Sequence, residues 1–237
     1  MRRYLLYTLL LLLVACDDGP VEENTYVQEE GRTCVLEGNI SGVENWSDGY
    51  NIALAGFDDE SDYAIILKNL PRQTRGHVTL QMAGIPDQVT QLELCVLNRI
   101  HQRVYTLASA SAEDMQQTDT IRFNVDAVNT SMFNTIQQAL FSPTCANCHG
   151  AGNRIAAGVD LTTGHSYQSL TNHPSIKLQG MQLVEPGDSL HSVLHLALAT
   201  DVSITDHWAI NHLDQISNET QRILHVIDDW IQGGAEE

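Results

Sequence analysis

Residues 121–140, IRFNVDAVNTSMFNTIQQAL, decide the fold prediction, because the spacing of their apolar residues changes halfway. Up to Val125, apolar and polar residues alternate, which is typical of a β-strand with one buried face. From Met132 to Leu140 the apolar residues recur at helical spacing, and Thr130 or Ser131 can serve as the N-cap. The sequence therefore predicts two parts of different structure that meet near Asn129.

Residues 33–128 carry the period of β structure. Seven short stretches are candidate strands, several of them with apolar and polar residues in alternation, and turn signals such as residues 47–49 (SDG) and 84–87 (GIPD) separate them. The stretches are residues 34–36, 50–54, 63–67, 77–82, 92–97, 104–107 and 121–125. About seven short strands at this spacing predict an all-β, sandwich-like domain. No catalytic motif appears in it, so we expect it to act as a spacer or docking domain.

Residues 129–237 are predicted to form an all-α domain. A second amphipathic helix is expected over residues 218–231, with Ile223, Ile227 and Trp230 on one side and Gly233-Gly234 at its end. Two such helices can pack on each other while the residues between them surround a cofactor. A bound cofactor would also stabilise the small core of such a domain.

The motif Cys145-Ala146-Asn147-Cys148-His149 follows the first of these helices. Two thiols at this spacing match the two vinyl groups of a haem, and the adjacent histidine reaches the iron. The motif therefore predicts one covalent haem c on Cys145 and Cys148, with His149 as the proximal iron ligand. A zinc site would need further ligands, and a thioredoxin-like motif would need a βαβ context. A chance match is the remaining alternative.

The first fifteen residues are predicted to be an export signal, because Arg2 and Arg3 precede a short apolar run. The run ends in Leu13-Val14-Ala15-Cys16, which resembles the lipobox of bacterial lipoproteins and implies a lipid on Cys16. An ordinary signal peptide with a chance cysteine is the alternative. Residues 16–32 are acidic and are expected to be a tether. These features predict a lipid-anchored protein of the bacterial cell envelope, on the periplasmic or cell-surface side.

Two further cysteines and the overall charge add expectations. Cys34 and Cys95 lie in the predicted β domain, and export makes a disulfide between them plausible, with two buried free thiols as the alternative. The formal net charge of −18 argues against a nucleic-acid partner and favours a partner with a basic docking surface. Beyond the signal, no stretch is apolar and long enough to span a bilayer.

Residues 132–235 resemble the single-haem cytochrome c domains of bacterial lipoproteins and planctomycete-type cytochromes. The resemblance begins at the haem motif and continues, in the family's order, through residues 158–161 (GVDL), 167–170 (YQSL), 184–188 (VEPGD), 192–194 (SVL) and 230–235 (WIQGGA). It implies an all-α cytochrome c domain, which favours an electron carrier over an enzyme. It does not extend to the β domain.

The sequence departs from this family at the distal iron ligand, which is commonly a Met followed by Pro before the last helix. The corresponding residues 206–214, DHWAINHLD, contain no Met. We expect His212, just before the last helix, to be the distal ligand. His207 and Met181 are alternatives, as is an iron without a distal ligand.

These features together predict a lipid-anchored c-type cytochrome that transfers electrons to or from a redox partner. An open distal site would instead permit haem-based ligand sensing or peroxidase chemistry. In a third interpretation, the β domain is a binding module and the haem is accessory to it.

Overall fold

The computed structural model describes residues 31–113, 120–150, 152, 155–201, 208, 210–217 and 220–237. The predicted signal, Cys16, most of the predicted tether and His207 lie outside these residues. No helix within the described ranges is long and apolar enough to cross a membrane.

Seven β-strands form two sheets. The first sheet has the order β4-β1-β7 and the second the order β3-β2-β5-β6. The strands are β1 (Arg32–Ser41), β2 (Tyr50–Phe57), β3 (Ile66–Asn69), β4 (Gly76–Ile85), β5 (Gln91–Asn98), β6 (Arg103–Ser111) and β7 (Thr120–Asn129). β1 runs parallel to β7, and the other paired strands are antiparallel. Each of the seven stretches expected from the sequence overlaps one strand.

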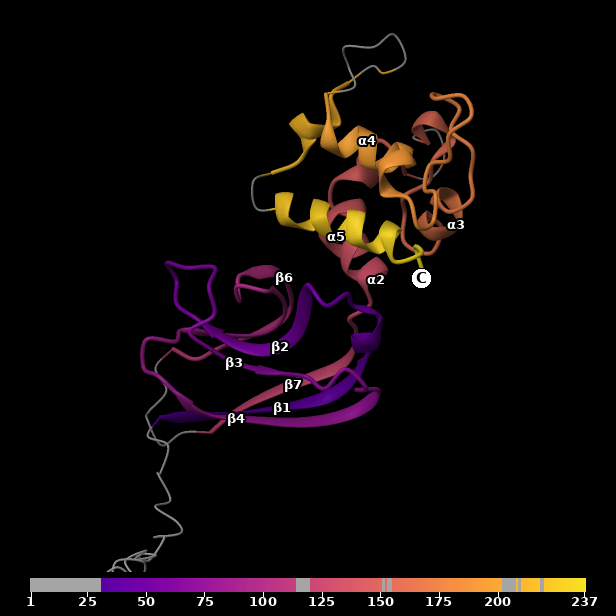
Figure 1. Cartoon of the computed structure of the whole chain (residues 1–237). Helices are drawn as coiled ribbons and strands as arrows, with labels where there is room; N and C mark the ends of the chain where they lie inside the picture. Colours follow the sequence, from indigo (N-terminus) through magenta and orange to yellow (C-terminus); the bar gives the residue numbers. More distant parts are fainter. Residues whose placement is uncertain are drawn as a thin grey trace, which may run out of the picture.

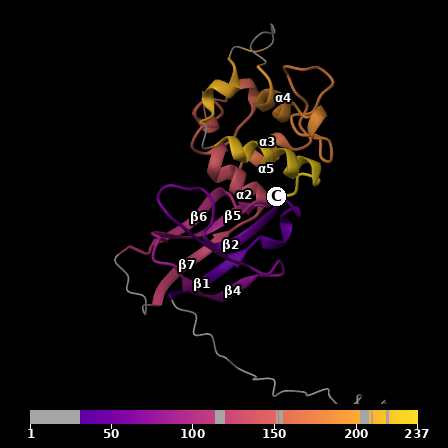
Figure 2. The ribbon, with the colours of Figure 1, turned by 60° about the vertical axis from the view of Figure 1, so that its left-hand side comes forward.

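The two sheets lie in layers, one over the other (Figure 1), and the same layers are seen from another side (Figure 2). Alternate residues of the strands are buried in the core, among them Leu36 in β1, Leu54 in β2 and Leu94 in β5. The other face of the second sheet buries a separate apolar cluster that includes Phe57 and Cys95. Both faces of this sheet are therefore covered.

The predicted Cys34–Cys95 disulfide is not formed: both cysteines are free and buried. Cys34 belongs to the core cluster of β1, whereas Cys95 belongs to the cluster on the far face of the second sheet. Since neighbouring residues of a strand point to opposite faces, the layer of the second sheet separates the two thiols. Burial raises the pKa of Cys34 to about 11 and also raises the pKa of Cys95 well above its usual value. Both therefore behave as small apolar core residues.

Residues 130–237 contain short helices joined by long loops. The α-helices of the described residues are α2 (Met132–Ile136), α3 (Ser166–Leu170), α4 (Val193–Ala199) and α5 (Gln221–Gln232). Ser131 caps α2 by accepting a hydrogen bond from the backbone N–H of Asn134 at 3.4 Å. A π-helical segment, η2 (Gln137–Phe141), continues α2 towards the cysteine motif.

The prediction of an all-α cytochrome c domain for residues 129–237 is wrong. The described chain is mostly β, with sheets of three and four strands, and three of its four α-helices have only 5, 5 and 7 residues. Glycines with positive φ interrupt the chain at Gly158, Gly164, Gly180 and Gly187. Each glycine permits a left-handed turn that a helix cannot contain. The segment between α2 and α5 is therefore built from short helices, turns and isolated β-bridges.

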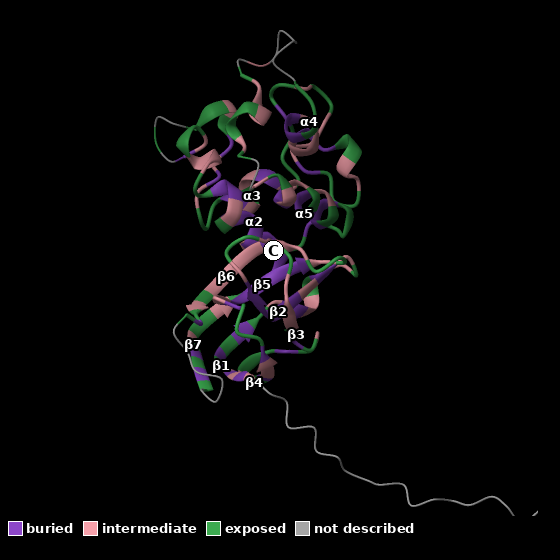
Figure 3. Cartoon of the chain, turned by 90° about the vertical axis from the view of Figure 1, so that its left-hand side faces the viewer, coloured by how far each residue is buried: buried purple, intermediate pink, exposed green. Residues whose placement is uncertain are grey.

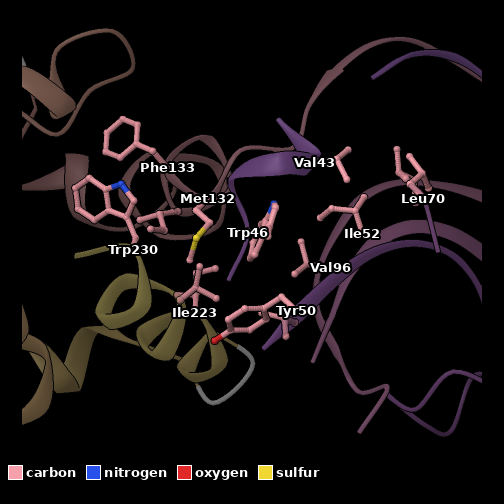
Figure 4. Close-up of a cluster of buried hydrophobic side chains, with 14 of the residues drawn as sticks. Val43, Trp46, Tyr50, Ile52, Leu70, Val96, Met132, Phe133, Ile223 and Trp230 are labelled. Atoms are coloured by element: carbon pink, nitrogen blue, oxygen red, sulfur yellow. The ribbon is translucent and has the colours of Figure 1, made fainter. Parts of the chain in front are cut away.

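The β part and the helical part share one hydrophobic core. Figure 4 shows Met132 and Ile223 of the helical part beside Trp46 and Tyr50 of the β part, with Phe133 and Trp230 farther along. Figure 3 shows buried residues both inside the sheets and along α2 and α5. The indole N–H of Trp46 donates to the carbonyl oxygen of Thr130 at 2.5 Å, at the junction between the parts. The two parts are therefore packed against each other rather than merely linked by the chain.

Candidate functional site

A tight turn holds the Cys145–His149 motif. Residues Cys145–Asn147 form the 3₁₀ turn η3, and the backbone N–H groups of Cys148 and His149 both donate to the carbonyl oxygen of Cys145, at 3.1 and 2.9 Å. Gly150 is required by close packing, because a Cβ there would lie 2.4 Å from the carbonyl oxygen of Ala146. The turn brings both thiols and the His149 ring to one cavity.

Main-chain contacts orient His149. Its Nδ1 lies 3.0 Å from the carbonyl oxygen of Ala156, and its own carbonyl accepts from the backbone N–H of Leu161 at 2.7 Å. Since a carbonyl only accepts hydrogen bonds, Nδ1 carries the proton and Nε2 keeps its lone pair. A histidine held this way by its second nitrogen is arranged as a metal ligand.

The cavity beside the motif has a volume of about 390 Å³. That volume lies within the range of about 300–1,000 Å³ that is typical of cofactor and small-molecule sites. Its wall is mostly apolar and includes Val193, Leu194, Ala197 and Leu198 of α4, together with Val159, Leu161, Leu170 and Leu183 from the loops. A wall of this kind favours a largely apolar ligand.

His212 lies opposite His149 across this cavity. The centroids of the two imidazole rings are 6.3 Å apart and their planes differ by 27°. The rings of His212 and Trp208 are nearly perpendicular, with their centroids 5.4 Å apart. His212 opens a short 3₁₀ helix, His212–Gln215, which is capped by the Asn211 side chain.

The state of His212 suits a metal ligand. Burial lowers the pKa of His212, with a smaller contribution from the nearby His149, and this shift favours the neutral ring. Its Nδ1 is buried and has no hydrogen-bond partner among the described residues. An imidazole binds a metal in its neutral form.

The other candidates for the distal position are placed differently. Met181 is not among the residues that line the cavity; its backbone groups bond to Leu178 and Ser175 instead. His207 lies outside the described residues. Of the candidates that the structure describes, His212 alone shares the cavity with Cys145, Cys148 and His149.

Two cavity residues were not singled out from the sequence. Trp208 lies among residues 206–214, next to His207. The sequence pattern gives no sign that its ring packs against a histidine side chain. Lys177 also lines the cavity. It is one of two lysines in the chain, and this low number is the sequence feature from which a special role could have been predicted.

The pKa of Cys145 distinguishes between the functions that the cysteine motif could have. Burial raises the pKa of Cys145 to about 12, with a smaller contribution from Cys148. A thioredoxin-like nucleophile needs the opposite shift, towards a stable thiolate. The described residues contain no group of three or more His, Cys, Asp and Glu side chains placed to hold a metal ion by themselves. The residues thus offer two thiols and two opposed imidazoles around an apolar space.

Comparisons with known proteins add no relative to this description. No protein-family model matches the chain, and no curated protein is detectably similar to it in sequence.

Proposed function

We propose that this chain is an exported, lipid-anchored c-type cytochrome, with one haem on Cys145 and Cys148, that transfers electrons. One observation carries the proposal: His149 and His212 face each other across an apolar cavity that both cysteines also line. The proposal rests on this site and not on an all-α fold, which the chain does not have.

The spacing of the histidines fits a single metal ion between them. Metal–nitrogen bonds to histidine are about 2.0–2.1 Å long. Two such bonds and half the width of each ring add up to about the 6.3 Å that separates the ring centroids. Haem iron already has four porphyrin nitrogens, so two protein ligands complete its coordination. The buried, unpartnered Nδ1 of His212 is a further sign of a ring placed for a ligand.

The cysteines fit covalent attachment. Each thiol can add across one vinyl double bond, with the sulfur bonding one carbon and the hydrogen going to the other, so the addition needs no oxidant. Two residues between Cys145 and Cys148 match the separation of the two vinyl groups. Cys145 and Cys148 would then each form one thioether, and His149 would be the proximal ligand.

The chemistry that such a haem supplies is one-electron exchange between Fe(II) and Fe(III). His149 and His212 would hold the iron in both states with little rearrangement, and two imidazoles favour a lower potential than a histidine and a methionine. The apolar residues of α4 that line the cavity would keep water away from a bound haem. The net charge of −18 supports a redox partner with a basic docking surface.

The test is expression of the full chain in a bacterium with cytochrome c maturation. We expect a red protein in the membrane fraction that is heavier by the mass of one haem and keeps its colour in acid–acetone. The Cys145→Ala/Cys148→Ala variant should lose the colour. Cys16→Ala serves as the matched cysteine control: it should keep the haem but move it to the soluble fraction.

Two outcomes would refute parts of the proposal separately. Haem that extracts from the wild type, or that stays bound covalently in the Cys145→Ala/Cys148→Ala variant, would contradict attachment at this motif. A Cys16→Ala protein that remains in the membrane fraction would contradict the lipid anchor while leaving the haem site standing.

A further inference from the structure

Lys177 is the one charged side chain among the described residues that line the cavity. All the other lining residues are apolar or uncharged polar residues, or are the histidines and cysteines of the site. The chain has 12 basic and 30 acidic residues. With this composition, a cavity lined by a lysine and by no acidic residue is unexpected. Its place at the cavity needs a physical reason.

A tight turn presents Lys177 at the mouth of the cavity. The buried hydroxyl oxygen of Ser175 accepts from the backbone N–H groups of Lys177 and Leu178, at 3.1 and 3.0 Å. The neighbouring Ile176 also lines the cavity yet is 75% exposed, so this turn forms part of the rim. Lys177 itself is exposed, which leaves its ammonium group hydrated and able to meet a ligand at the opening.

We propose that Lys177 forms an ion pair with the carboxylate edge of the haem and so sets which edge of the ring faces the rim; this inference rests on the proposed function. The two propionates are the anionic groups of a haem, and an ionised carboxylate is costly to bury without a partner. The thioether edge is held at Cys145 and Cys148. Pairing the carboxylate edge with Lys177 keeps the charges at the opening and the apolar ring inside.

The ion pair has a redox consequence. A positive charge beside the carboxylate offsets negative charge near the iron, and that negative charge would otherwise stabilise Fe(III). Removing the lysine therefore lowers the midpoint potential. The sign follows from Coulomb's law, and solvent reduces the size of the effect because Lys177 is exposed at the rim.

The two lysines of the chain provide a matched pair of variants. Lys177→Met and Lys68→Met make the same substitution and the same change in net charge. Lys68 is in β3, where its ammonium group donates to the carbonyl oxygen of Gln81. In the haem-loaded protein, we expect Lys177→Met to have a lower midpoint potential than both the wild type and Lys68→Met. Lys177→Arg should restore most of the difference.

A second measurement needs no substitution at Lys177. Acetylation with an amine-specific reagent, followed by mass spectrometry, compares the two lysines in haem-loaded wild type and in the Cys145→Ala/Cys148→Ala variant. Lys177 should react more slowly in the loaded protein, while Lys68 should react equally in both. This readout also keeps the inference testable if Lys177→Met does not accumulate.

The outcomes distinguish this inference from the proposed function. If the wild type carries covalent haem but Lys177→Met has the same potential as Lys68→Met, the ion pair is overturned and the haem site stands. Equal acetylation of Lys177 with and without haem likewise overturns the ion pair alone. If the wild type carries no covalent haem, the proposed function fails, and this inference fails with it.

Discussion

At the scale of single residues, His212 determines which chemistry the site can support. Its ring faces His149 at 6.3 Å, whereas Met181 does not line the cavity. With His212 bound, the iron would have no free position and electron transfer would be favoured. With it displaced, a small ligand could reach the iron, and sensing or peroxidase chemistry would become accessible.

We therefore expect His212→Ala to convert the haem-loaded protein from low spin to high spin and to allow carbon monoxide to bind the reduced iron. Met181→Ala is the control and should leave the visible spectrum unchanged. Visible spectra of both redox states provide the measurement. A change of spin state in Met181→Ala or in His207→Ala, with none in His212→Ala, would contradict the assignment.

At the scale of elements, the pairing of β1 with β7 depends on one residue without a side chain. Gly38 of β1 lies opposite Val125 of β7, just before an irregularity in the register between Gly38 and Asn39. A Cβ on Gly38 would lie 2.1 Å from the carbonyl oxygen of Val125, far closer than van der Waals contact. The parallel pair therefore requires glycine at this position.

Gly38→Ala should force β1 and β7 apart and lower the free energy of unfolding by roughly 1–3 kcal/mol, the usual cost of overpacking. Urea unfolding measures the change. Gly49→Ala is the matched control, because its Cβ would meet only the Ser47 hydroxyl oxygen, at 3.6 Å. Equal unfolding midpoints for the two variants would show that the strands tolerate the added methyl group.

At the scale of the whole molecule, Asp62 joins the β part to the helical part. Its two carboxylate oxygens accept from Arg103 of β6 and from Arg222 of α5, each at 2.7 Å. Arg103 also donates to the buried Glu93 at 2.5 Å. The four charges balance, which makes this network a structural contact between the parts. Arg222, and then Arg103, hold the pKa of Asp62 below its usual value.

Asp62→Asn should destabilise the protein by about 1 kcal/mol at neutral pH, since the pairs are partly exposed to solvent. The depressed pKa sets the sign of the pH dependence. The contribution of Asp62 is fully present above the ordinary aspartate pKa of about 3.9 and is lost as the pH falls through the lower folded value. Urea unfolding at neutral and acidic pH should therefore show a difference that shrinks in acid. The exposed Asp126→Asn changes the same charge and should have little effect at either pH.

The sequence by itself determined the local features of this protein. Short apolar stretches between turn signals, several of them alternating with polar residues, located the seven strands. The spacing of Ile223, Ile227 and Trp230 located the last helix, because this pattern follows from the helical period. The Cys145–His149 motif could be recognised because its residues are adjacent in the chain. The prediction of an all-α domain was wrong because it followed from the resemblance of residues 132–235 to cytochrome c domains, whereas turns at glycines with positive φ interrupt the segment between the two helices.

Tertiary structure alone decided which distant residues meet. It placed Cys34 and Cys95 on faces separated by a sheet, paired β1 with β7 in parallel, and brought His149, Lys177 and His212 to one cavity. It also joined the two parts through Asp62 and the core around Met132. The physical reason is that local periods report which residues are buried, whereas the partner that buries each of them depends on how the whole chain packs.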